Sequence, residues 1–282
     1  MAIQSITILG GRGMLGRDLA QAAQDCGLGV RSFDLPELDI TDPQALERAA
    51  EGADAIVNCA AFTDVEMAES RVALANQVNG YAVGRLGQIA KEAGLPVVHI
   101  STDFVFDGTK DGPYAESDKP CPVNVYGSSK LLGEVLLAES GCRWCIVRVQ
   151  WTYGRHGRNF ITKITEAARQ RSEVQVVADQ VGCPTHTLDA ARILCRMLMR
   201  TDFPEGLFHL AAGGCVSRYE MTCYLFERLG IQTPVRPCRS ADFKTAARRP
   251  LNSCFDCTKL QTLLGTPIRS WQEMLNDYLE ML

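Results

Sequence analysis

The chain has 282 residues, enough for one large domain or for a main domain with a smaller lobe. Its formal net charge of −4 argues against nucleic acid as the main partner, because phosphate backbones require clustered Lys and Arg. No apolar run reaches the roughly 18 residues of a membrane span, and no secretory leader pattern precedes the first predicted strand. We therefore expect a cytoplasmic protein with no membrane partner.

Strands and helices are predicted to alternate over the first half of the chain. Short runs rich in Val and Ile, separated by amphipathic segments, are typical of a parallel sheet with helices on both faces. The predicted strands are Ser5–Leu9, Val30–Phe33, Ala55–Asn58, Val97–Ser101 and Cys145–Val149. The predicted helices are Leu15–Cys26, Pro43–Ala50, Ala68–Ala93 and Ser128–Glu139. This order indicates an α/β fold, with a Rossmann-type doubly wound parallel sheet over residues 1–150.

The pattern becomes irregular after about residue 150. Helices are predicted at Asn159–Gln170, Thr187–Met199, Arg218–Leu229 and Ser270–Leu282, and short strands at Val174–Val177 and Leu207–Leu210. The loops between them carry Gly, Pro and Arg. We predict that residues 151–282 form mainly a smaller C-terminal lobe that binds a substrate, with some segments returning to the first domain.

A glycine-rich loop joins the first predicted strand to the first predicted helix. Gly10, Gly13 and Gly16 occur at three-residue intervals. Such a loop lets the chain turn tightly and lets its backbone approach a pyrophosphate at the helix N-terminus. The alternative is a tight turn without a ligand, but the position between strand and helix favours an NAD(P)-binding loop.

The sequence gives opposing indications about which dinucleotide is bound. Asp34 ends the second predicted strand, where an acidic side chain binds the adenosine ribose of NAD. Arg12 favours NADP instead, because a guanidinium can hold its 2′-phosphate. Both side chains are also compatible with an ordinary solvated surface. We predict NADPH or NADH, with a slight preference for NADPH.

Several other residues are predicted to contact the cofactor. Small side chains follow the third predicted strand, and they allow a cofactor to cross the end of that strand. Asn79 is predicted either to brace the site or to pack within its helix. The predicted positions are Asp39 and Ile40 at the adenine edge, and Ala60, Ala61 and Thr63 after the third strand.

The catalytic prediction rests on Tyr126 and Lys130, four residues apart on one helix face. An ammonium beside a phenol favours the phenolate, so the pair can transfer a proton to a developing alkoxide. Such a spacing often occurs in surface helices. Here the fourth predicted strand ends at Thr102 and Asp103, in the crevice where open α/β sheets bind ligands. Thr102 is predicted to orient a substrate carbonyl and Asp103 to bind a sugar hydroxyl, although an Asx-type turn explains the same residues.

The twelve cysteines are predicted to be mainly small core residues. Two Cys-x-x-Cys pairs, Cys142/Cys145 and Cys254/Cys257, admit a zinc or redox role, but neither has a neighbouring His. The four His show no ligand spacing. We assign no metal.

Longer motifs carry a family resemblance over nearly the whole chain. They are Asn58–Glu69, Ser101–Gly108, Asp179–Thr185 and Arg249–Ser253, together with the glycine loop and the Tyr126/Lys130 pair. The chain resembles the dTDP-4-dehydrorhamnose reductases, which are extended short-chain dehydrogenase/reductases. The resemblance implies hydride transfer from NAD(P)H to C4 of a nucleotide-linked 4-keto-6-deoxy sugar, most simply dTDP-4-dehydrorhamnose, and it allows a homodimer.

The resemblance also assigns roles to individual residues. Tyr126 would donate the proton, Lys130 would be its electrostatic partner, and Thr102 would orient the carbonyl. Further cofactor contacts would come from Met14 and Leu15, next to Gly13, and further substrate contacts from Trp151 and Arg249, beside Asp103. Gln150 departs from the family, which usually has a small residue there, and we expect its amide to lie near the nicotinamide or the sugar. Asp18 is shorter than the Glu with which some members bind magnesium.

Two other functions are compatible with the same residues. One is a regulatory subunit of the methionine adenosyltransferase type, which keeps the fold and the cofactor loop but serves a partner enzyme. The other is a nucleotide-sugar 4-epimerase, which retains tightly bound NAD. Turnover with added NADPH distinguishes the reductase from both.

Overall fold

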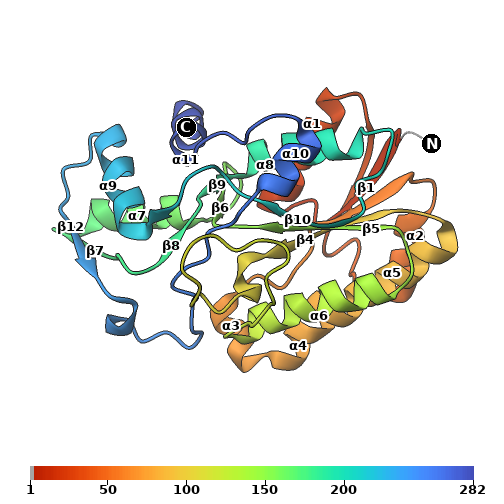
Figure 1. Cartoon of the computed structure of the whole chain (residues 1–282), viewed down its shortest axis with the longest axis horizontal. Coiled ribbons are helices and arrows are strands. Elements are labelled where there is room, and N and C mark those ends of the chain that lie inside the picture. Colours follow the sequence, from red (N-terminus) through yellow and green to blue (C-terminus); the bar gives the residue numbers. More distant parts are fainter. Residues whose placement is uncertain (1–2) are drawn as a thin grey trace.

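The computed structural model describes residues 3–282, and its centre is a six-stranded, wholly parallel sheet (Figure 1). The strand order is β10-β5-β4-β3-β1-β2. The strands are β1 (Ser5–Leu9), β2 (Gly29–Phe33), β3 (Ala55–Asn58), β4 (Val97–Thr102), β5 (Trp144–Val149) and β10 (Gly206–Leu210). The order reverses between β1 and β3, which is where open α/β sheets form a ligand crevice. The predicted fold class is confirmed.

Helices cover both faces of this sheet, as the sequence pattern predicts (Figure 1). One face is covered by α1 (Met14–Asp25), α8 (Thr187–Leu198) and α10 (Thr258–Leu264). The other is covered by α2 (Pro43–Ala50), α5 (Ala82–Ala93) and α6 (Val125–Glu139). Side chains alternate between the two resulting cores, since Ile8 packs with the α1 side and its neighbour Leu9 with the α2 side.

The single helix predicted over Ala68–Ala93 is wrong, because the structure divides this segment. It contains α3 (Val65–Ser70), α4 (Val72–Asn76), a π-helical turn (Gln77–Tyr81) and then α5. The π turn contains Asn79, whose amide bonds both the N–H and the C=O of Phe62, at 2.8 and 3.1 Å, and also Ser129. Irregular turns of this kind persist where a side chain is held at a specific position. Asn79 therefore braces the segment that follows β3.

A smaller lobe follows β5 and lies at the left of Figure 1. Its helices are α7 (Phe160–Gln170), α9 (Arg218–Leu229) and α11 (Trp271–Glu280), and they share one apolar core. Its short strands pair as β6 (Thr152–Tyr153) with β9 (Thr185–His186), β8 (Val181–Gly182) with β11 (Val216–Ser217), and β7 (Val174–Val177) with β12 (Val235–Cys238). Two 3₁₀ turns occur at Asp103–Val105 and Ser240–Asp242. Because α8, β10 and α10 return to the main sheet, the lobe is not one continuous stretch, and the predicted boundary near residue 150 stays a prediction.

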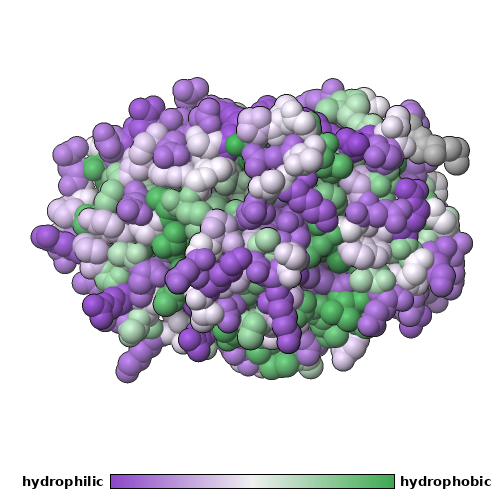
Figure 2. Space-filling view, viewed as in Figure 1, coloured by the Kyte–Doolittle hydropathy of each residue, from purple (hydrophilic) through white to green (hydrophobic). Residues whose placement is uncertain are grey.

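Polar and apolar side chains are mixed over the face shown in Figure 2. Apolar groups gather along its lower edge, where Figure 1 places α3 and α4, and exposed Met67, Val72 and Leu74 belong to these helices. Among residues 3–282, no helix has the length and apolar character needed to span a membrane.

Candidate active site

The glycine loop forms an open cradle at the N-terminus of α1. Gly10 has φ +78°, and a Cβ there would lie 2.5 Å from the backbone N of Ala60, so only glycine fits. Gly13 is the N-cap of α1, and no side chain caps this helix end. A Cβ at Gly13 would meet only the carbonyl oxygen of Gly10, at 3.2 Å. The helix N-terminus therefore faces free space, as binding of a dinucleotide pyrophosphate requires.

A cavity of about 440 Å³ lies beside this cradle, along the carboxyl ends of β1, β3, β4 and β5. It brings together most of the residues predicted for the cofactor, for catalysis and for the substrate. Those that line it are Gly10, Gly13, Met14, Leu15, Ala61, Thr63, Thr102, Asp103, Tyr126, Lys130 and Trp151. We call it the cofactor cleft.

Arg12 and Asp34, the two residues predicted to select the cofactor, do not line the cleft and lie beyond the glycine loop. An oxygen of Asp34 accepts the backbone N–H of Arg12 at 2.8 Å. The guanidinium of Arg12 bonds the carbonyl oxygen of Leu35 at 2.9 Å and forms an exposed ion pair with Glu37. In this arrangement the side chains of Arg12 and Asp34 are both engaged by other protein groups. Their roles in selecting NADP or NAD stay predictions.

Four other predicted cofactor residues also lie outside the cleft. Asp39 accepts hydrogen bonds from the N–H and the hydroxyl of Thr41, at 2.9 and 2.8 Å, and Ile40 is buried in the core beside α2. Ala60 donates its N–H to Asn58 at 3.1 Å, and Asn79 acts through Phe62 as described above. These residues support the loops around the cleft, and direct cofactor contact by any of them stays a prediction.

Tyr126 lies in the first turn of α6, which begins earlier than predicted. Asn124 caps the helix by accepting the N–H of Gly127 at 2.7 Å, and the Tyr126 ring packs edge-on against Phe104, with centroids 5.5 Å apart. Burial raises the pKa of Tyr126 to about 12, while the neighbouring Thr102 hydroxyl acts in the opposite direction. The expected lowering of the Tyr126 pKa is therefore not found. A neutral phenol is nevertheless the form that donates a proton during reduction.

Lys130 is buried beneath the cleft and faces β4. Its Nζ donates to the carbonyl oxygen of Ile100 at 2.7 Å and lies 3.3 Å from Nε2 of His99. Burial lowers the pKa of Lys130 to about 8, although Glu134 and Cys59 act to raise it. The ammonium is thus held by the strand rather than by the tyrosine, and it is readily deprotonated.

His99 contributes to this environment through its tautomer. Asn58 accepts the Ala60 N–H with its Oδ1, so its amide nitrogen must point at Nδ1 of His99, 3.1 Å away. Burial, and then the Lys130 charge, lower the His99 pKa well below its usual value, so the ring is neutral. With Nδ1 accepting, the proton assigned from the hydrogen-bond network lies on Nε2 and points toward Lys130. This N–H disfavours the charged form of Lys130.

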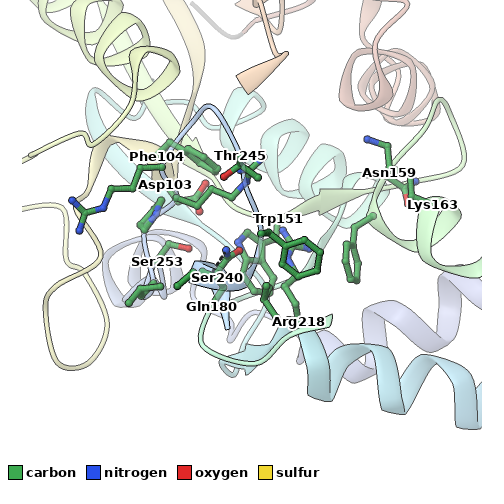
Figure 3. A pocket seen from close by; sticks show the side chains of 18 residues that line it. Asp103, Phe104, Trp151, Asn159, Lys163, Gln180, Arg218, Ser240, Thr245 and Ser253 are labelled. Atoms are coloured by element: carbon green, nitrogen blue, oxygen red, sulfur yellow. Dashed lines mark hydrogen bonds between the residues drawn. The ribbon is translucent and has the colours of Figure 1, made fainter. Parts of the chain in front are cut away.

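A second cavity, of about 610 Å³, adjoins the cofactor cleft (Figure 3). The two share Asp103, Phe104, Trp151, Asn159 and Arg218. The second cavity is also lined by Lys163, Arg248 and Arg249 from the smaller lobe and its connecting segment. We call it the substrate cavity, because four cationic side chains around one hollow suit an anionic ligand such as a nucleoside diphosphate.

Arg218 is the functional candidate that the sequence did not reveal. It is the first residue of α9, behind the capping box of Ser217 and Glu220, and its guanidinium carbon lies 3.5 Å over the Trp151 ring. Burial lowers the pKa of Arg218 to about 9. The Ser-x-x-Glu pattern locates the helix start, but nothing in the sequence pairs Arg218 with Trp151, about 70 positions away.

Trp151 is held in a backbone conformation that residues other than glycine rarely adopt. Its φ is 42°, and such strain occurs mostly where the surrounding structure enforces it at functional sites. The indole packs over Gly182, where a Cβ would lie only 2.6 Å from the ring. The predicted substrate residue Trp151 is therefore fixed between the two cavities by Gly182 and Arg218.

Arg249, a predicted substrate contact, lines the substrate cavity but is already paired. Its guanidinium lies 2.7 Å from Glu66 and donates to the carbonyl oxygen of Ala247 at 3.1 Å. Arg218 and Lys163 have no carboxylate partner among the ion pairs of residues 3–282. They are the better candidates to meet an anion.

Gln150 does not lie where we expected it. Its side chain is buried and lines neither cavity. It accepts the N–H of Cys183 at 2.7 Å and donates to the hydroxyl of Ser253 at 2.8 Å and to the Ser253 carbonyl oxygen. The larger amide fits because its hydrogen bonds satisfy groups of two loops, one at Cys183 and one at Ser253. Gln150 therefore stabilises these loops without facing either cavity.

Comparison with known proteins identifies the family. The family described as "RmlD substrate binding domain" matches residues 4–282. The chain is 36% identical to dTDP-4-dehydrorhamnose reductase of Aggregatibacter actinomycetemcomitans, over 96% of this chain and 97% of that protein. It is 40% identical to the reductase of Sinorhizobium fredii, over 78% and 77%. The Bacillus anthracis reductase in complex with NADP superposes with a TM-score of 0.94 at 30% identity, covering 100% of both chains.

This chain belongs to the dTDP-4-dehydrorhamnose reductase family. It is an oxidoreductase of the extended short-chain dehydrogenase/reductase type, in a family that uses NAD(P)H. The relatives are not uniform in substrate. A dTDP-4-keto-6-deoxy-D-glucose reductase of Streptomyces niveus is 35% identical over 98% of this chain and 96% of that protein. Membership therefore leaves the sugar open.

Proposed function

We propose that this protein reduces the 4-keto group of dTDP-4-dehydrorhamnose to give dTDP-rhamnose, with NADPH preferred over NADH. The supporting observation is the junction of the two cavities. Thr102 and Tyr126 line the cofactor cleft, and Asp103, next to Thr102, lines both the cleft and the cationic substrate cavity. A nucleotide sugar lying across that junction has its ketone beside Tyr126 and its diphosphate beside Arg218.

The residues of the cleft divide the reduction between them. The Gly13 cradle and the small residues Ala61 and Thr63 hold the dinucleotide, which supplies the hydride to the ketone carbon. Tyr126, protonated because of its burial, gives its phenolic proton to the carbonyl oxygen as charge develops there. The Thr102 hydroxyl, which in the structure donates to Asp103 Oδ1, turns its one proton to the same oxygen and orients it. No charged alkoxide accumulates.

Substrate recognition is assigned to the second cavity. Arg218 and Lys163 meet the diphosphate, and the edge of the Trp151 ring borders the sugar, because Arg218 and Gly182 pack against the ring. Asp103 is buried, and its Oδ2 has no hydrogen-bond partner while Oδ1 accepts from Thr102 at 3.1 Å. An unpartnered buried oxygen is costly, so a sugar hydroxyl donating to Oδ2 stabilises the complex.

A turnover assay tests the proposal. Purified protein is mixed with NADPH or NADH and either dTDP-4-dehydrorhamnose or dTDP-4-keto-6-deoxyglucose, and the product is identified by NMR. Consumption of NADPH with formation of dTDP-rhamnose is expected. No consumption with either sugar contradicts the reductase and favours a regulatory subunit. Stoichiometric NAD in the purified protein and turnover without added reductant indicate an epimerase.

The cellular location and the assembly are part of the same proposal. We expect a cytoplasmic location, because the proposed substrate and product are both nucleotide sugars and the cofactor NADPH is a soluble dinucleotide. A homodimer is expected to cover the apolar face of α3 and α4, where Met67 and Val72 are exposed. Sedimentation equilibrium measures this directly, and Val72→Lys is expected to shift a dimer toward monomer.

A further inference from the structure

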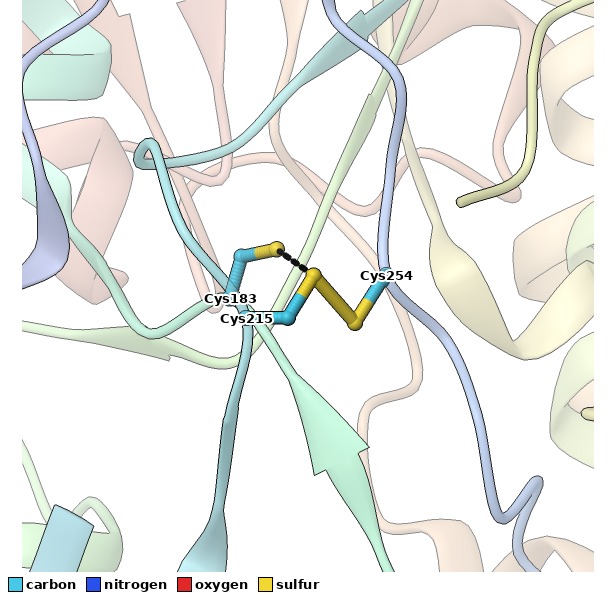
Figure 4. A group of neighbouring side chains, drawn as sticks. All are labelled: Cys183, Cys215 and Cys254. Atoms are coloured by element: carbon cyan, nitrogen blue, oxygen red, sulfur yellow. Dashed lines mark hydrogen bonds between the residues drawn. A yellow bond between two sulfur atoms is a disulfide. The ribbon is translucent and has the colours of Figure 1, made fainter. Parts of the chain in front are cut away.

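Three cysteines from segments far apart in the sequence meet in the structure (Figure 4). Cys183 directly follows β8, Cys215 directly precedes β11, and Cys254 follows Ser253. Their sulfur atoms all lie within 4.8 Å of one another. The Sγ atoms of Cys183 and Cys215 are 3.6 Å apart, and Cys215 and Cys254 are joined by a disulfide. Within residues 3–282, this is the one group of three or more potential metal ligands that converge so closely.

We propose that in the reduced chain these three thiolates bind a thiophilic divalent cation of the zinc class. Tetrahedral zinc with bonds to sulfur of about 2.3 Å holds its sulfur ligands about 3.8 Å apart. The Cys183–Cys215 separation is close to this value, and the third sulfur lies within reach of both. A disulfide needs only two of the three sulfurs and leaves Cys183 without a role. Clustered cysteines in a reducing compartment are more often metal ligands than stable disulfides.

The surroundings provide an entry path and an open coordination position. Cys215 is exposed, while Cys183 and Cys254 are buried. A cavity of about 380 Å³ is lined by Cys183, Cys215 and Cys257. The Cys257 thiol is directed at the carbonyl oxygen of Ala211, 3.8 Å away, so Cys254 and Cys257 do not act as a Cys-x-x-Cys pair. The fourth position of the ion faces the cavity and is left to water.

The three thiols are attached to the segments that build the substrate cavity. Gln150 accepts the N–H of Cys183 and bonds Ser253, the residue before Cys254. Cys215 lies three positions before Arg218. A bound ion therefore ties together loops that carry substrate-cavity side chains, and it takes the structural role of a clamp. The metal site itself does not depend on which sugar the enzyme reduces.

Cobalt is the probe for this site, because thiolate-bound Co²⁺ absorbs intensely through sulfur-to-metal charge transfer. The full chain is reduced, freed of metal and titrated anaerobically with Co²⁺. Saturation at one equivalent is expected, with loss of the cobalt spectrum when Zn²⁺ is added. Cys183→Ser, Cys215→Ser and Cys254→Ser should each abolish the charge-transfer band. Cys223→Ser, which removes a half-buried thiol of the same lobe, should retain it.

Oxidation gives a second test on the same sulfurs. Diamide takes two electrons and two protons from Cys215 and Cys254 and forms their disulfide. The thiols titrated in denaturant should then fall from the 12 of the sequence to 10, and Co²⁺ binding should disappear until a reductant is added.

The proposal is overturned if the reduced wild-type chain gives no thiolate charge-transfer band, or if Cys183→Ser keeps the band. The three cysteines would then be a disulfide with a neighbouring thiol. Should the variants fail to fold by circular dichroism, the zinc content of the wild-type chain decides without them. One zinc per chain after purification in reductant is expected, and its absence, with no uptake of added zinc, also overturns the proposal.

Discussion

The cofactor cleft and the substrate cavity differ in how the chain builds them. The cleft is formed at the carboxyl ends of parallel strands, and each of its key side chains follows a strand or begins a helix within a short motif. The substrate cavity is formed by α7, α9 and the segment from residue 240 to 253, whose side chains come from loops and helix ends far apart in the sequence. The chemistry that we propose thus lies on the rigid sheet, and the proposed recognition lies on segments that differ more easily between relatives.

The largest expected effect tests the chemical half of that comparison. Tyr126→Phe removes the proposed proton donor while its ring still packs against Phe104. General acid catalysis is worth about 100- to 10,000-fold, so kcat should fall by that factor. The Kd for NADPH, measured by fluorescence titration, should stay unchanged, because the cradle is intact. Unchanged turnover would remove Tyr126 from the mechanism.

A second variant tests whether the substrate cavity recognises the nucleotide sugar. Arg218→Gln keeps a polar side chain over Trp151 but removes the positive charge shared by the two cavities. A hydrogen bond to a charged group contributes about 1.5–3 kcal/mol, so the KM for the nucleotide sugar should rise roughly 10- to 100-fold. The KM for NADPH should not change. Arg171→Gln, an exposed position that ends α7 in the same lobe, is the matched control and should behave as wild type. Equal increases in both KM values would mean that Arg218 organises the junction and does not recognise the sugar nucleotide.

Substitution of Arg12, which lies beyond the glycine loop and outside the cofactor cleft, is expected to have a smaller effect. Arg12→Ala should raise the KM for NADPH by about 5- to 10-fold, since an exposed charge-assisted contact is partly screened by solvent. The KM for NADH should hardly change. Glu37→Gln provides the opposite test, because it releases the guanidinium from its ion pair and should strengthen the preference for NADPH. If Arg12→Ala affects both cofactors equally, Arg12 stabilises the loop and does not select the phosphate.

The same comparison explains what could be predicted from the sequence. The strands, the glycine loop and the order of Thr102, Tyr126 and Lys130 follow from local patterns, because short apolar runs and helix-start signals act within a few residues. The break in the predicted 68–93 helix was missed because it depends on Asn79 reaching Phe62 and Ser129, a contact between separate segments. Periodicity alone cannot indicate such a contact.

The substrate cavity shows more clearly which roles cannot be predicted from the sequence. Arg218 acquires its role only when α9 brings it over Trp151, and Gln150 is a brace only because Cys183 and Ser253 lie on either side of it. The position of Gln150 in the chain predicts that it lies beside the ligand, but its side chain is buried and lines neither cavity. Three-dimensional proximity between distant loops decides these roles.

The smallest expected effect concerns the pH dependence of the cleft. Tyr126, with a pKa of about 12, stays protonated through the usual assay range, whereas Lys130, with a pKa of about 8, loses its charge as pH rises. The kcat/KM, which reports the free enzyme, should therefore fall above about pH 8 if the Lys130 charge supports binding or proton transfer. Glu134 opposes this loss, and His99 promotes it through its Nε2–H.

His99→Leu separates these influences. It removes the N–H that faces Lys130 while the carbonyl oxygen of Ile100 still accepts from the ammonium. An interaction of about 0.5–1.5 kcal/mol corresponds to roughly half a unit to one unit of pKa, so the alkaline limb should move to higher pH by that amount. A limb that does not move in His99→Leu would show that burial alone sets the Lys130 pKa. The Asn58–His99 pair would then have no influence on the pKa of Lys130, and strand β4 would contribute only to the shape of the cleft.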